Sequence, residues 1–300
     1  MVHSRVSRRE LLTGIAGVPA VLATKSAYKP KLSVQTYVWT QVLGEQKRTL
    51  GDGLEEIFAG CKKAGFREME VGKELLAPDL KSKTAELLKK YKMRLTSVYA
   101  AGPMYEAAMA EKTIAEAVET AEAARELGVK MILSNPNPKP NRGRKSDEEL
   151  AIQARYVTKF GEELQKRGMK LALHHHNPEM AENAREWRHL LKNVDPKLAG
   201  ICIDVDWVIR GGQDAMTMLR EAGSRIVSLH LRNSRHGVWT ESLDEGDYDY
   251  GSVAAFLKEI GFQGYLIVEL AHEKGMTISR PLVENLRRSR EFTEKVFGVR

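Results

Sequence analysis

The sequence predicts a single-domain α/β protein, a closed (β/α)₈ TIM barrel, over residues 31–300. Eight short apolar runs with strand character alternate with eight segments of helical periodicity. At four places a helical segment ends at a glycine before the next run begins: AGFREMEV, LGVKMILS, RGMKLALH and IGFQGYLIVE. An open doubly wound sheet is the alternative, but the first run, VQTYVWTQVLG, is not followed by the G-x-G-x-x-G turn typical of that fold.

The elements follow one another in a regular order. The apolar runs predict strands near residues 32–38, 67–71, 94–99, 129–134, 170–176, 199–204, 225–231 and 265–269. The amphipathic segments predict helices near residues 53–64, 79–92, 106–127, 147–167, 181–193, 213–223, 251–260 and 281–296. Such apolar strands must be covered by the crossover helices, so they run parallel and their carboxyl ends meet at one face, where barrels of this kind carry function.

Residues 1–30 are predicted to be an export signal and linker. Basic Arg5, Arg8 and Arg9 precede the apolar run Leu11–Ala23, and small residues follow. The segment SRRELL resembles the twin-arginine consensus, which implies export of a folded protein to the periplasm. Cleavage is left open, with an uncleaved membrane anchor as the alternative. Residues 31–300 contain no run of about 18 apolar residues, so we expect no membrane span there.

Charge and cysteine content give little support to two classes of site, a nucleic-acid interface and a thiol metal site or disulfide framework. The formal net charge is +7, too small an excess over 300 residues to indicate a nucleic-acid partner. Cys61 and Cys202 each fall within a predicted regular element and show no spacing of a thiol metal site or disulfide framework. We interpret both cysteines as small buried hydrophobic residues.

Polar side chains gather at the predicted strand ends. Because strand side chains alternate, His174 and His176 should share one face and His175 the other, and the same rule pairs Asp204 with Asp206. One imidazole or carboxylate from each of the last four strands would form a mixed nitrogen and oxygen site for Mn²⁺, Co²⁺, Zn²⁺ or Mg²⁺. These candidate metal ligands are His174, Asp204, His230 and Glu269, with His174 or His176 left open for the fifth strand.

Several segments resemble the xylose isomerase-like TIM barrel superfamily over about residues 31–296. They are GFREMEVG, LALHHHNPE, GICIDVDW, RIVSLHLRNS, DEGDYDY and LIVELA. The superfamily is similar in pattern to sugar phosphate isomerases and epimerases, tagatose 3-epimerases, hydroxypyruvate isomerases and inosose dehydratases, and more distantly to endonuclease IV. The resemblance implies a divalent metal on Asp204, His230 and Glu269. His174 stands where the superfamily more often has glutamate, which puts a symmetric two-glutamate epimerisation in doubt.

The residues predict proton abstraction beside the carbonyl of a keto sugar, through an enediolate. Glu269 or Glu179 would be the base, and His176 or Arg232 would stabilise the oxyanion. The candidate substrate-binding residues are Glu70, Asp206, Trp207 and Trp239. The long polar loop at residues 234–249 is expected to close over the ligand, with Asp247 and Asp249 anchoring the loop and capping a helix.

The predicted function is therefore a divalent-metal-dependent sugar isomerase or epimerase. The alternatives are a lyase or dehydratase acting on a keto-inositol or 3-keto-glycoside, a non-catalytic carbohydrate-binding barrel, and a DNA-repair nuclease like endonuclease IV. The sequence leaves open the substrate, the native metal and whether the protein is a homo-oligomer.

The histidine run generates a first prediction. His174→Ala should weaken metal binding and abolish most activity, whereas His175→Ala, on the opposite strand face, should mainly disturb packing. Metal titration and thermal unfolding of both variants check this. Equal effects of the two substitutions on metal binding would contradict the alternation argument.

Overall fold

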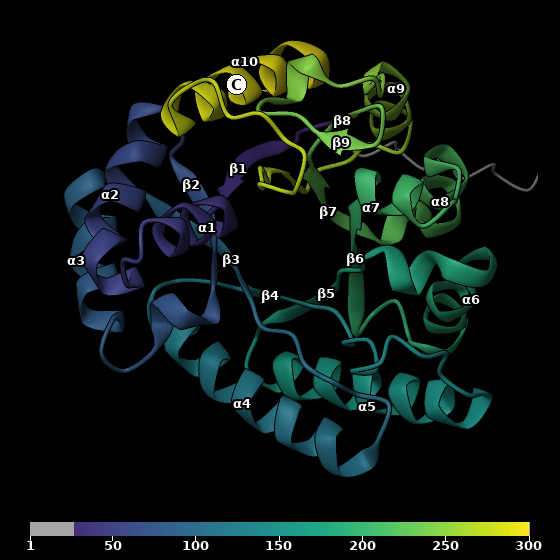
Figure 1. The fold of residues 1–300 in the computed structure, drawn as a ribbon. Coiled ribbons are helices and arrows are strands. Elements are labelled where there is room, and N and C mark those ends of the chain that lie inside the picture. Colours follow the sequence, from purple (N-terminus) through teal and green to yellow (C-terminus); the bar gives the residue numbers. More distant parts are fainter. Residues whose placement is uncertain (1–26, 300) are drawn as a thin grey trace, which may run out of the picture.

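Eight parallel strands close into a barrel in the computed structural model, which describes residues 27–299. Residues 1–26 of the predicted export signal and linker, which was expected over residues 1–30, lie outside that range. The order around the barrel is β1–β10–β7–β6–β5–β4–β3–β2, and β1 pairs with β2, which confirms the predicted fold class (Figure 1). The strands are β1 (Lys31–Gln35), β2 (Glu68–Gly72), β3 (Arg94–Tyr99), β4 (Met131–Ser134), β5 (Lys170–Leu173), β6 (Ala199–Asp204), β7 (Ile226–Leu231) and β10 (Tyr265–Val268).

Helices surround the barrel on the outside (Figure 1). The ones that the sequence predicts are α2 (Leu50–Lys63), α3 (Lys81–Tyr91), α4 (Ala107–Glu126), α5 (Asp147–Lys166), α6 (Asn177–Asn193), α8 (Ala215–Ala222), α9 (Gly251–Glu259) and α10 (Leu282–Phe297). Reciprocal capping boxes begin α2, through Thr49 and Asp52, and α5, through Ser146 and Glu149. The four glycines of the repeated helix-to-strand pattern, Gly65, Gly128, Gly168 and Gly261, all have positive φ, as helix stops require.

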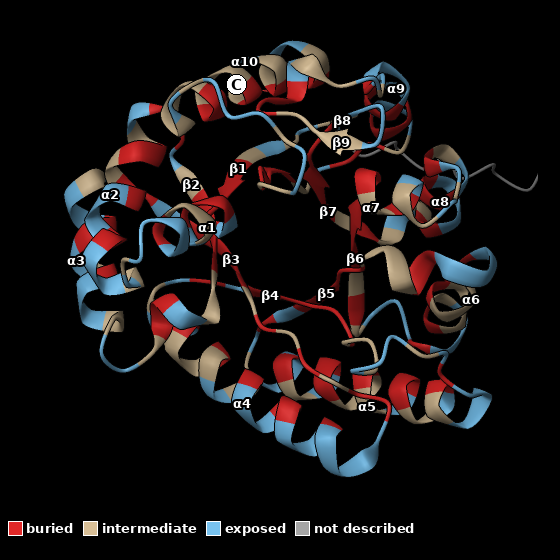
Figure 2. Ribbon diagram, in the orientation of Figure 1, coloured by how far each residue is buried: buried red, intermediate tan, exposed pale blue. Residues whose placement is uncertain are grey.

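The core has two parts. The larger part fills the layer between the strands and the inner faces of the helices, where Figure 2 shows the buried residues. The smaller part lies among the strands and consists of Met131, Leu133, Ala172 and Cys202. Both cysteines are buried, as predicted.

The structure differs from the predicted elements where strands end. The first strand was expected to reach residue 38, but helix α1 (Tyr37–Glu45) already begins two residues after β1. Helix α7 (Val205–Arg210) begins directly after β6, and the loop after β7 contains the short antiparallel hairpin β8 (Ser234–Arg235) and β9 (Val238–Trp239). Strand β5 ends at Leu173, so the three histidines follow the strand instead of extending it.

Helix α6 is interrupted beside these histidines. Glu182, Asn183 and Ala184 all have left-handed backbone conformations, with φ of 51°, 59° and 53°. A left-handed residue other than glycine costs roughly 1–2 kcal/mol. Three such residues in a row therefore make the start of α6 a strained segment.

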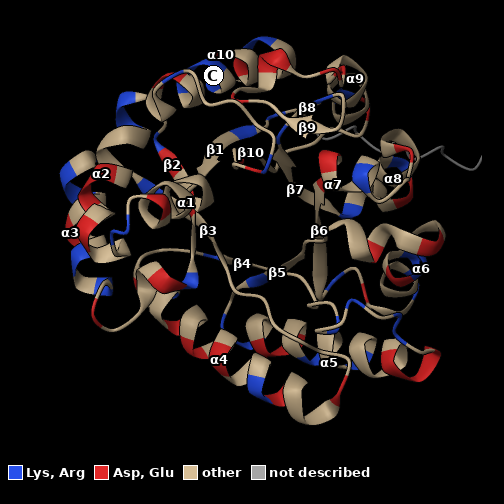
Figure 3. Ribbon diagram, in the orientation of Figure 1, with Lys and Arg blue, Asp and Glu red and all other residues tan. Residues whose placement is uncertain are grey.

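Residues of both charge signs are mixed along the outer helices in Figure 3. No helix within residues 27–299 combines the length and apolar character that crossing a membrane requires.

Barrel closure depends on a close backbone approach at Gly264, just before β10. A Cβ atom at this position would lie 2.0 Å from the carbonyl oxygen of Val227 in β7. We expect Gly264→Ala to lower the free energy of unfolding by about 1–3 kcal/mol, as overpacking does, measured by chemical denaturation.

Gly44 in α1 is the matched control, because nothing lies within 4 Å of a Cβ there. Gly44→Ala should leave stability unchanged or raise it by up to about 1 kcal/mol. Equal effects of the two substitutions would show that the approach at Gly264 does not constrain the barrel.

Candidate active site

His230 on β7 lies at the centre of a buried polar cluster within the barrel. Its Nε2 atom is 2.9 Å from Glu70 Oε1, and its Nδ1 atom is 2.9 Å from Glu269 Oε2. Glu70 also accepts a hydrogen bond of 2.6 Å from the Ser97 hydroxyl. Although burial alone would lower the pKa of His230, the neighbouring Cys202, Glu269 and Glu70 raise it well above its usual value. The surroundings of this imidazole thus favour positive charge.

Arg232 joins the two remaining carboxylates of the cluster. Its guanidinium forms an ion pair with Glu269, and its Nε atom lies 3.3 Å from Asp204 Oδ2. Burial opposes ionisation of Glu269, yet Arg232 and His230 hold the pKa of this carboxyl well below its usual range. Burial raises the pKa of Asp204 despite Arg232. The guanidinium therefore stabilises the charge of Glu269 more than that of Asp204.

Asp204 also begins the next helix. Its Oδ1 atom accepts a hydrogen bond of 3.0 Å from the backbone N–H of Trp207, which caps α7. Its Oδ2 atom faces Arg232. One carboxylate thus serves both the scaffold and the site.

The three histidines have separate environments. The ring centroids of His174 lie 4.6 Å from His230 and 4.9 Å from His176, so His174 and His176 face the cluster together. As predicted, His175 points elsewhere: its ring is 4.8 Å from that of Trp187 in α6, and its Nε2 atom accepts from the Asp204 backbone N–H at 3.2 Å. Burial lowers the pKa of His174 well below its usual value and that of His176 to about 4, which keeps both rings neutral and able to bind a metal.

Two overlapping groups of side chains could hold a metal ion. In each group, the ligand atoms lie within 4.8 Å of one another. One group is Asp204, His230 and Glu269, and the other is His174, Cys202 and His230. Within the described residues, His174 Nδ1 is buried without a hydrogen-bond partner. His230 Nδ1 and Asp204 Oδ2 instead face charged groups, Glu269 at 2.9 Å and Arg232 at 3.3 Å.

Asp206 and Trp239 link the loops above the cluster. Asp206 accepts hydrogen bonds from Arg210 Nε at 2.6 Å and from Trp239 Nε1 at 2.7 Å. Glu273 pairs with Arg210 at 2.7 Å and accepts from the Trp239 backbone N–H at 2.5 Å. These bonds tie α7, the β8–β9 hairpin and the loop after β10 together.

Trp207 lies between this loop assembly and the cluster. Its ring is 5.3 Å from the ring of His176 and 5.4 Å from that of Trp239. The guanidinium carbon of Arg232 lies 5.3 Å from the Trp207 ring and 4.5 Å from the Trp239 ring. The two tryptophans thus cover the buried arginine.

Glu179 lies in the first turn of α6 and supports the histidine run. Its Oε2 atom accepts a hydrogen bond of 2.9 Å from the backbone N–H of His176. Burial, with the nearby charge of Glu186, raises the pKa of Glu179 to about 7. A carboxyl with such a pKa exchanges protons readily near neutral pH.

The structure corrects one step of the sequence argument. Asp206 was expected to share a face with Asp204 because strand side chains alternate, but Asp206 lies in helix α7 and its partners are Arg210, Ser234 and Trp239. Sequence reasoning also missed Arg210 and Glu273, which no strand pattern marks, and Cys202, which was interpreted only as a hydrophobic residue. Side chains two residues apart in a strand point to the same face, so Cys202 shares the inward face of β6 with Asp204. This alternation is the sequence signal that could have identified the thiol.

The anchoring roles expected for two loop aspartates are confirmed. Asp247 Oδ2 accepts from the His236 backbone N–H at 2.8 Å, and Asp249 Oδ1 accepts from the Gly251 backbone N–H at 2.8 Å, at the start of α9.

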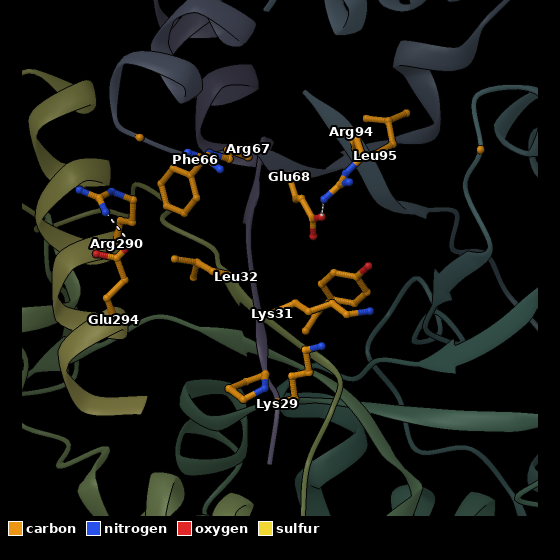
Figure 4. Close-up of a pocket in the computed structure, with 14 residues that line it drawn as sticks. Lys29, Lys31, Leu32, Phe66, Arg67, Glu68, Arg94, Leu95, Arg290 and Glu294 are labelled. Atoms are coloured by element: carbon orange, nitrogen blue, oxygen red, sulfur yellow. Dashed lines mark hydrogen bonds and ion pairs between the residues drawn. The ribbon is translucent and has the colours of Figure 1, made fainter. Parts of the chain in front are cut away.

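A separate pocket lies at the opposite, amino-terminal end of the barrel (Figure 4). Its charged groups are largely paired with neighbours, as in Arg94 with Glu68 and Arg290 with Glu294. Lys31 lies over the ring of Tyr265, with its Nζ atom 5.0 Å from the centroid. Because side chains at this end of such barrels usually serve stability, the cluster around His230 is the stronger candidate site.

Known proteins share both the fold and the sequence pattern. The family model described as "Xylose isomerase-like TIM barrel" matches residues 58–296. An inosose dehydratase of Clostridium perfringens is 23% identical, with 88% of this chain and 97% of that protein covered. The crystal structure of a sugar phosphate isomerase/epimerase from Parabacteroides distasonis superposes with a TM-score of 0.70 at 19% identity, covering 94% of this chain and all of that one. The IolI protein with a bound zinc atom superposes with a TM-score of 0.67 at 17% identity, covering 89% and 98%.

The pKa of Glu179 generates a prediction about stability. Below about pH 4.5 this carboxyl is protonated in both folded and unfolded states, but between pH 4.5 and 7 the unfolded chain ionises first. This difference lowers the stability of the natural protein as pH rises, by at most about 3 kcal/mol. Glu179→Gln should remove that part of the pH dependence in denaturant unfolding at pH 4.5, 6 and 8.

The exposed residue Glu119 provides the control, since Glu119→Gln should leave the pH profile of stability unchanged. Parallel profiles for the natural protein and Glu179→Gln would contradict the buried environment of Glu179.

Proposed function

The chain belongs to the xylose isomerase-like TIM barrel family, and on that premise we propose that it is a divalent-metal-dependent enzyme that isomerises or epimerises a keto sugar or sugar derivative. The observation that carries this proposal is the buried cluster around His230, in which carboxylates, neutral imidazoles and one arginine converge at the carboxyl ends of the strands. Buried ionisable groups in such a place are typical of catalytic sites.

The side chains present fit a metal ion. His230 belongs to both groups with ligand geometry, Asp204 and Glu269 complete one of them, and His174 belongs to the other. His174 Nδ1, which is buried without a hydrogen-bond partner among residues 27–299, is an atom that a cation would engage. When bound, a divalent ion polarises the substrate carbonyl and lowers the energy of the enediolate.

The protein side chains would divide the remaining work. Glu269 is held ionised by Arg232 and His230, which suits a fixed negative charge better than a proton carrier. Glu179, with a pKa of about 7, suits the general base that removes the α-proton and returns it. Arg232 and the neutral His176 would bind the developing oxyanion, and Trp207 would shield it from water.

A second candidate reaction is loss of water from a keto-inositol. The curated relatives named inosose dehydratase support it, because their similarity extends over most of both chains. His174, in the place where the superfamily commonly has glutamate, also supports it, because elimination needs one base for the α-proton and one acid for the leaving hydroxyl. Glu179 could supply one of these two groups, and a side chain among His174, Asp204, His230 and Glu269 could supply the other.

Export of the folded barrel is part of the proposal. The twin-arginine-like segment in residues 1–26 supports it, since that route carries proteins that have already folded and bound their metal.

The proposal is tested with purified protein incubated in D₂O with ketohexoses, 3-keto-glycosides and inososes. Proton NMR should show metal-dependent exchange of the α-hydrogen with solvent deuterium and formation of an isomer, an epimer or a dehydrated product. A chelator should abolish turnover, and metal analysis should give one divalent ion per chain.

Glu269→Gln should lower kcat by about a hundredfold or more, whereas the exposed Glu119→Gln should not change it. Sugar binding without exchange or turnover on every substrate would favour a non-catalytic barrel. Absence of stoichiometric metal after loading with Mn²⁺, Co²⁺ or Zn²⁺ would overturn the proposal.

A further inference from the structure

One guanidinium joins the three loops that lie above the candidate active site. Arg210, in the last turn of α7, donates from Nη1 and Nη2 to the two carboxylate oxygens of Glu273, at 2.9 and 2.7 Å. Its Nε atom donates to Asp206 at 2.6 Å, and Nη2 also donates to the carbonyl oxygen of Gly237 at 3.0 Å. These partners lie in the loop after β10, in α7 and in the turn of the β8–β9 hairpin.

The loops that Arg210 joins follow the strands that carry candidate metal ligands. Helix α7 follows Asp204 at the end of β6, and the hairpin follows His230 on β7. Glu273 lies beyond the end of β10, in the loop that begins with Glu269. Within residues 27–299, Arg210 forms its hydrogen bonds and ion pairs with the loops and not with these ligands. Its influence on the site therefore passes through the loops.

The partners of Arg210 also hold Trp239. The indole Nε1–H of Trp239 donates to Asp206 at 2.7 Å, and its backbone N–H donates to Glu273. The guanidinium carbon of Arg210 lies 4.5 Å from the centroid of the Trp239 ring. Because an arginine can pair with two carboxylates in a fixed planar geometry, Arg210 fixes both acceptors of Trp239 at once.

Trp239 in turn packs against Trp207 at the site. The two rings meet edge to face with their centroids 5.4 Å apart, and the Trp207 ring lies 5.3 Å from that of His176. The indole N–H of Trp239 is bonded to Asp206, whereas that of Trp207 is buried without a hydrogen-bond partner within residues 27–299. Since an unpaired buried donor is unfavourable, the Trp207 N–H is available to an oxygen atom of a ligand.

The charged cluster below the two indoles is held independently of them. The guanidinium carbon of Arg232 lies 4.5 Å from the Trp239 ring, but its ion pairs with Glu269 and Asp204 fix it from the side of the barrel. Loosening the indoles would therefore remove contacts to a bound substrate and leave the groups at the reacting carbon in place. Such a change raises KM more than it lowers kcat.

We propose that Arg210 is a positioning residue for substrate binding, which holds Trp239 and, through it, Trp207 against the substrate. The inference rests on the keto-sugar activity proposed above and identifies the residue that orders the substrate-binding side of that site. Arg210 itself does not touch the substrate. It acts through Asp206 and Glu273, which it holds in the positions that Trp239 requires.

The first test needs no substrate. Two indoles in contact give an exciton couplet in the far-ultraviolet circular dichroism spectrum, and Trp207 with Trp239 is the one contact between tryptophan rings within residues 27–299. The natural protein should show this couplet, and Trp207→Phe should lack it. Arg210→Lys should weaken it by about half or more, because an ammonium group cannot reproduce the planar pairing with two carboxylates.

Arg167→Lys is the matched control. Arg167 also pairs with two carboxylates, those of Glu122 and Glu163, and its side chain is 25% exposed, compared with 20% for Arg210. It follows α5 directly and precedes β5, at the opposite end of the barrel. Arg167→Lys should keep the full couplet.

The second test is steady-state kinetics with D-fructose and an inosose as probes. Arg210→Lys should raise KM by about tenfold and change kcat by less than about threefold, whereas Arg167→Lys should change neither. A third measurement uses only the natural protein and so does not depend on the folding of a variant. The Trp239 indole N–H should exchange with solvent at least about tenfold more slowly than an exposed indole, as NMR measures.

The outcomes separate this inference from the proposed function. A full couplet in Arg210→Lys, or rapid exchange of the Trp239 indole N–H in the natural protein, would overturn the positioning role. A fall in kcat at unchanged KM, or equal effects of Arg210→Lys and Arg167→Lys, would overturn it as well. Absence of turnover by the natural protein on every substrate would overturn the proposed function, and loss of the couplet in Arg210→Lys would then still support the positioning of the indoles.

Discussion

The site depends on the burial of three carboxylates around His230 and Arg232. Glu70, Asp204 and Glu269 are at most 7% exposed; Arg232 is the permanent cation beside Asp204 and Glu269, and Glu70 contacts His230. An uncompensated charge in a protein interior costs several kcal/mol, so this cluster requires further positive charge. His230, whose pKa is raised by its neighbours, can supply part of it as a proton, and a divalent cation can supply the rest. Binding of the proposed divalent cation would therefore be linked to folding of this interior.

The barrel itself could be predicted because its determinants are local. Each helix stop at a left-handed glycine and each short apolar run is visible in a few consecutive residues, and the observed strands agree closely with the predicted ones. Helices α1 and α7 were missed because they begin immediately after strands β1 and β6, where the apolar pattern of the strand continues into the first helical turn. The position of a strand's end depends on caps such as Asp204, which a period of two does not reveal.

The site could be predicted only as a set of candidates. The predicted strand ends identified Asp204, His230 and Glu269 as candidate metal ligands, and the structure brings these three residues together. The separation of His174 from His175 followed from alternation, even though both lie beyond the end of β5. The approach of Cys202 to His174 and His230 depends on the register shift between β6 and β7, and the pairing of Arg232 with two acids depends on side-chain conformations. Neither property is contained in the spacing of residues along one chain.

The double use of Asp204 limits how this site can change in evolution or in engineering. The same carboxylate caps α7 and faces Arg232, and α7 in turn carries Asp206, Trp207 and Arg210. A substitution chosen to alter the electrostatics at Asp204 therefore also loosens the helix that positions the loops above the site. Substitutions that change the reaction type are therefore expected at residues that do not also cap a helix. Asp204, in contrast, should tolerate replacement only together with compensating changes in α7.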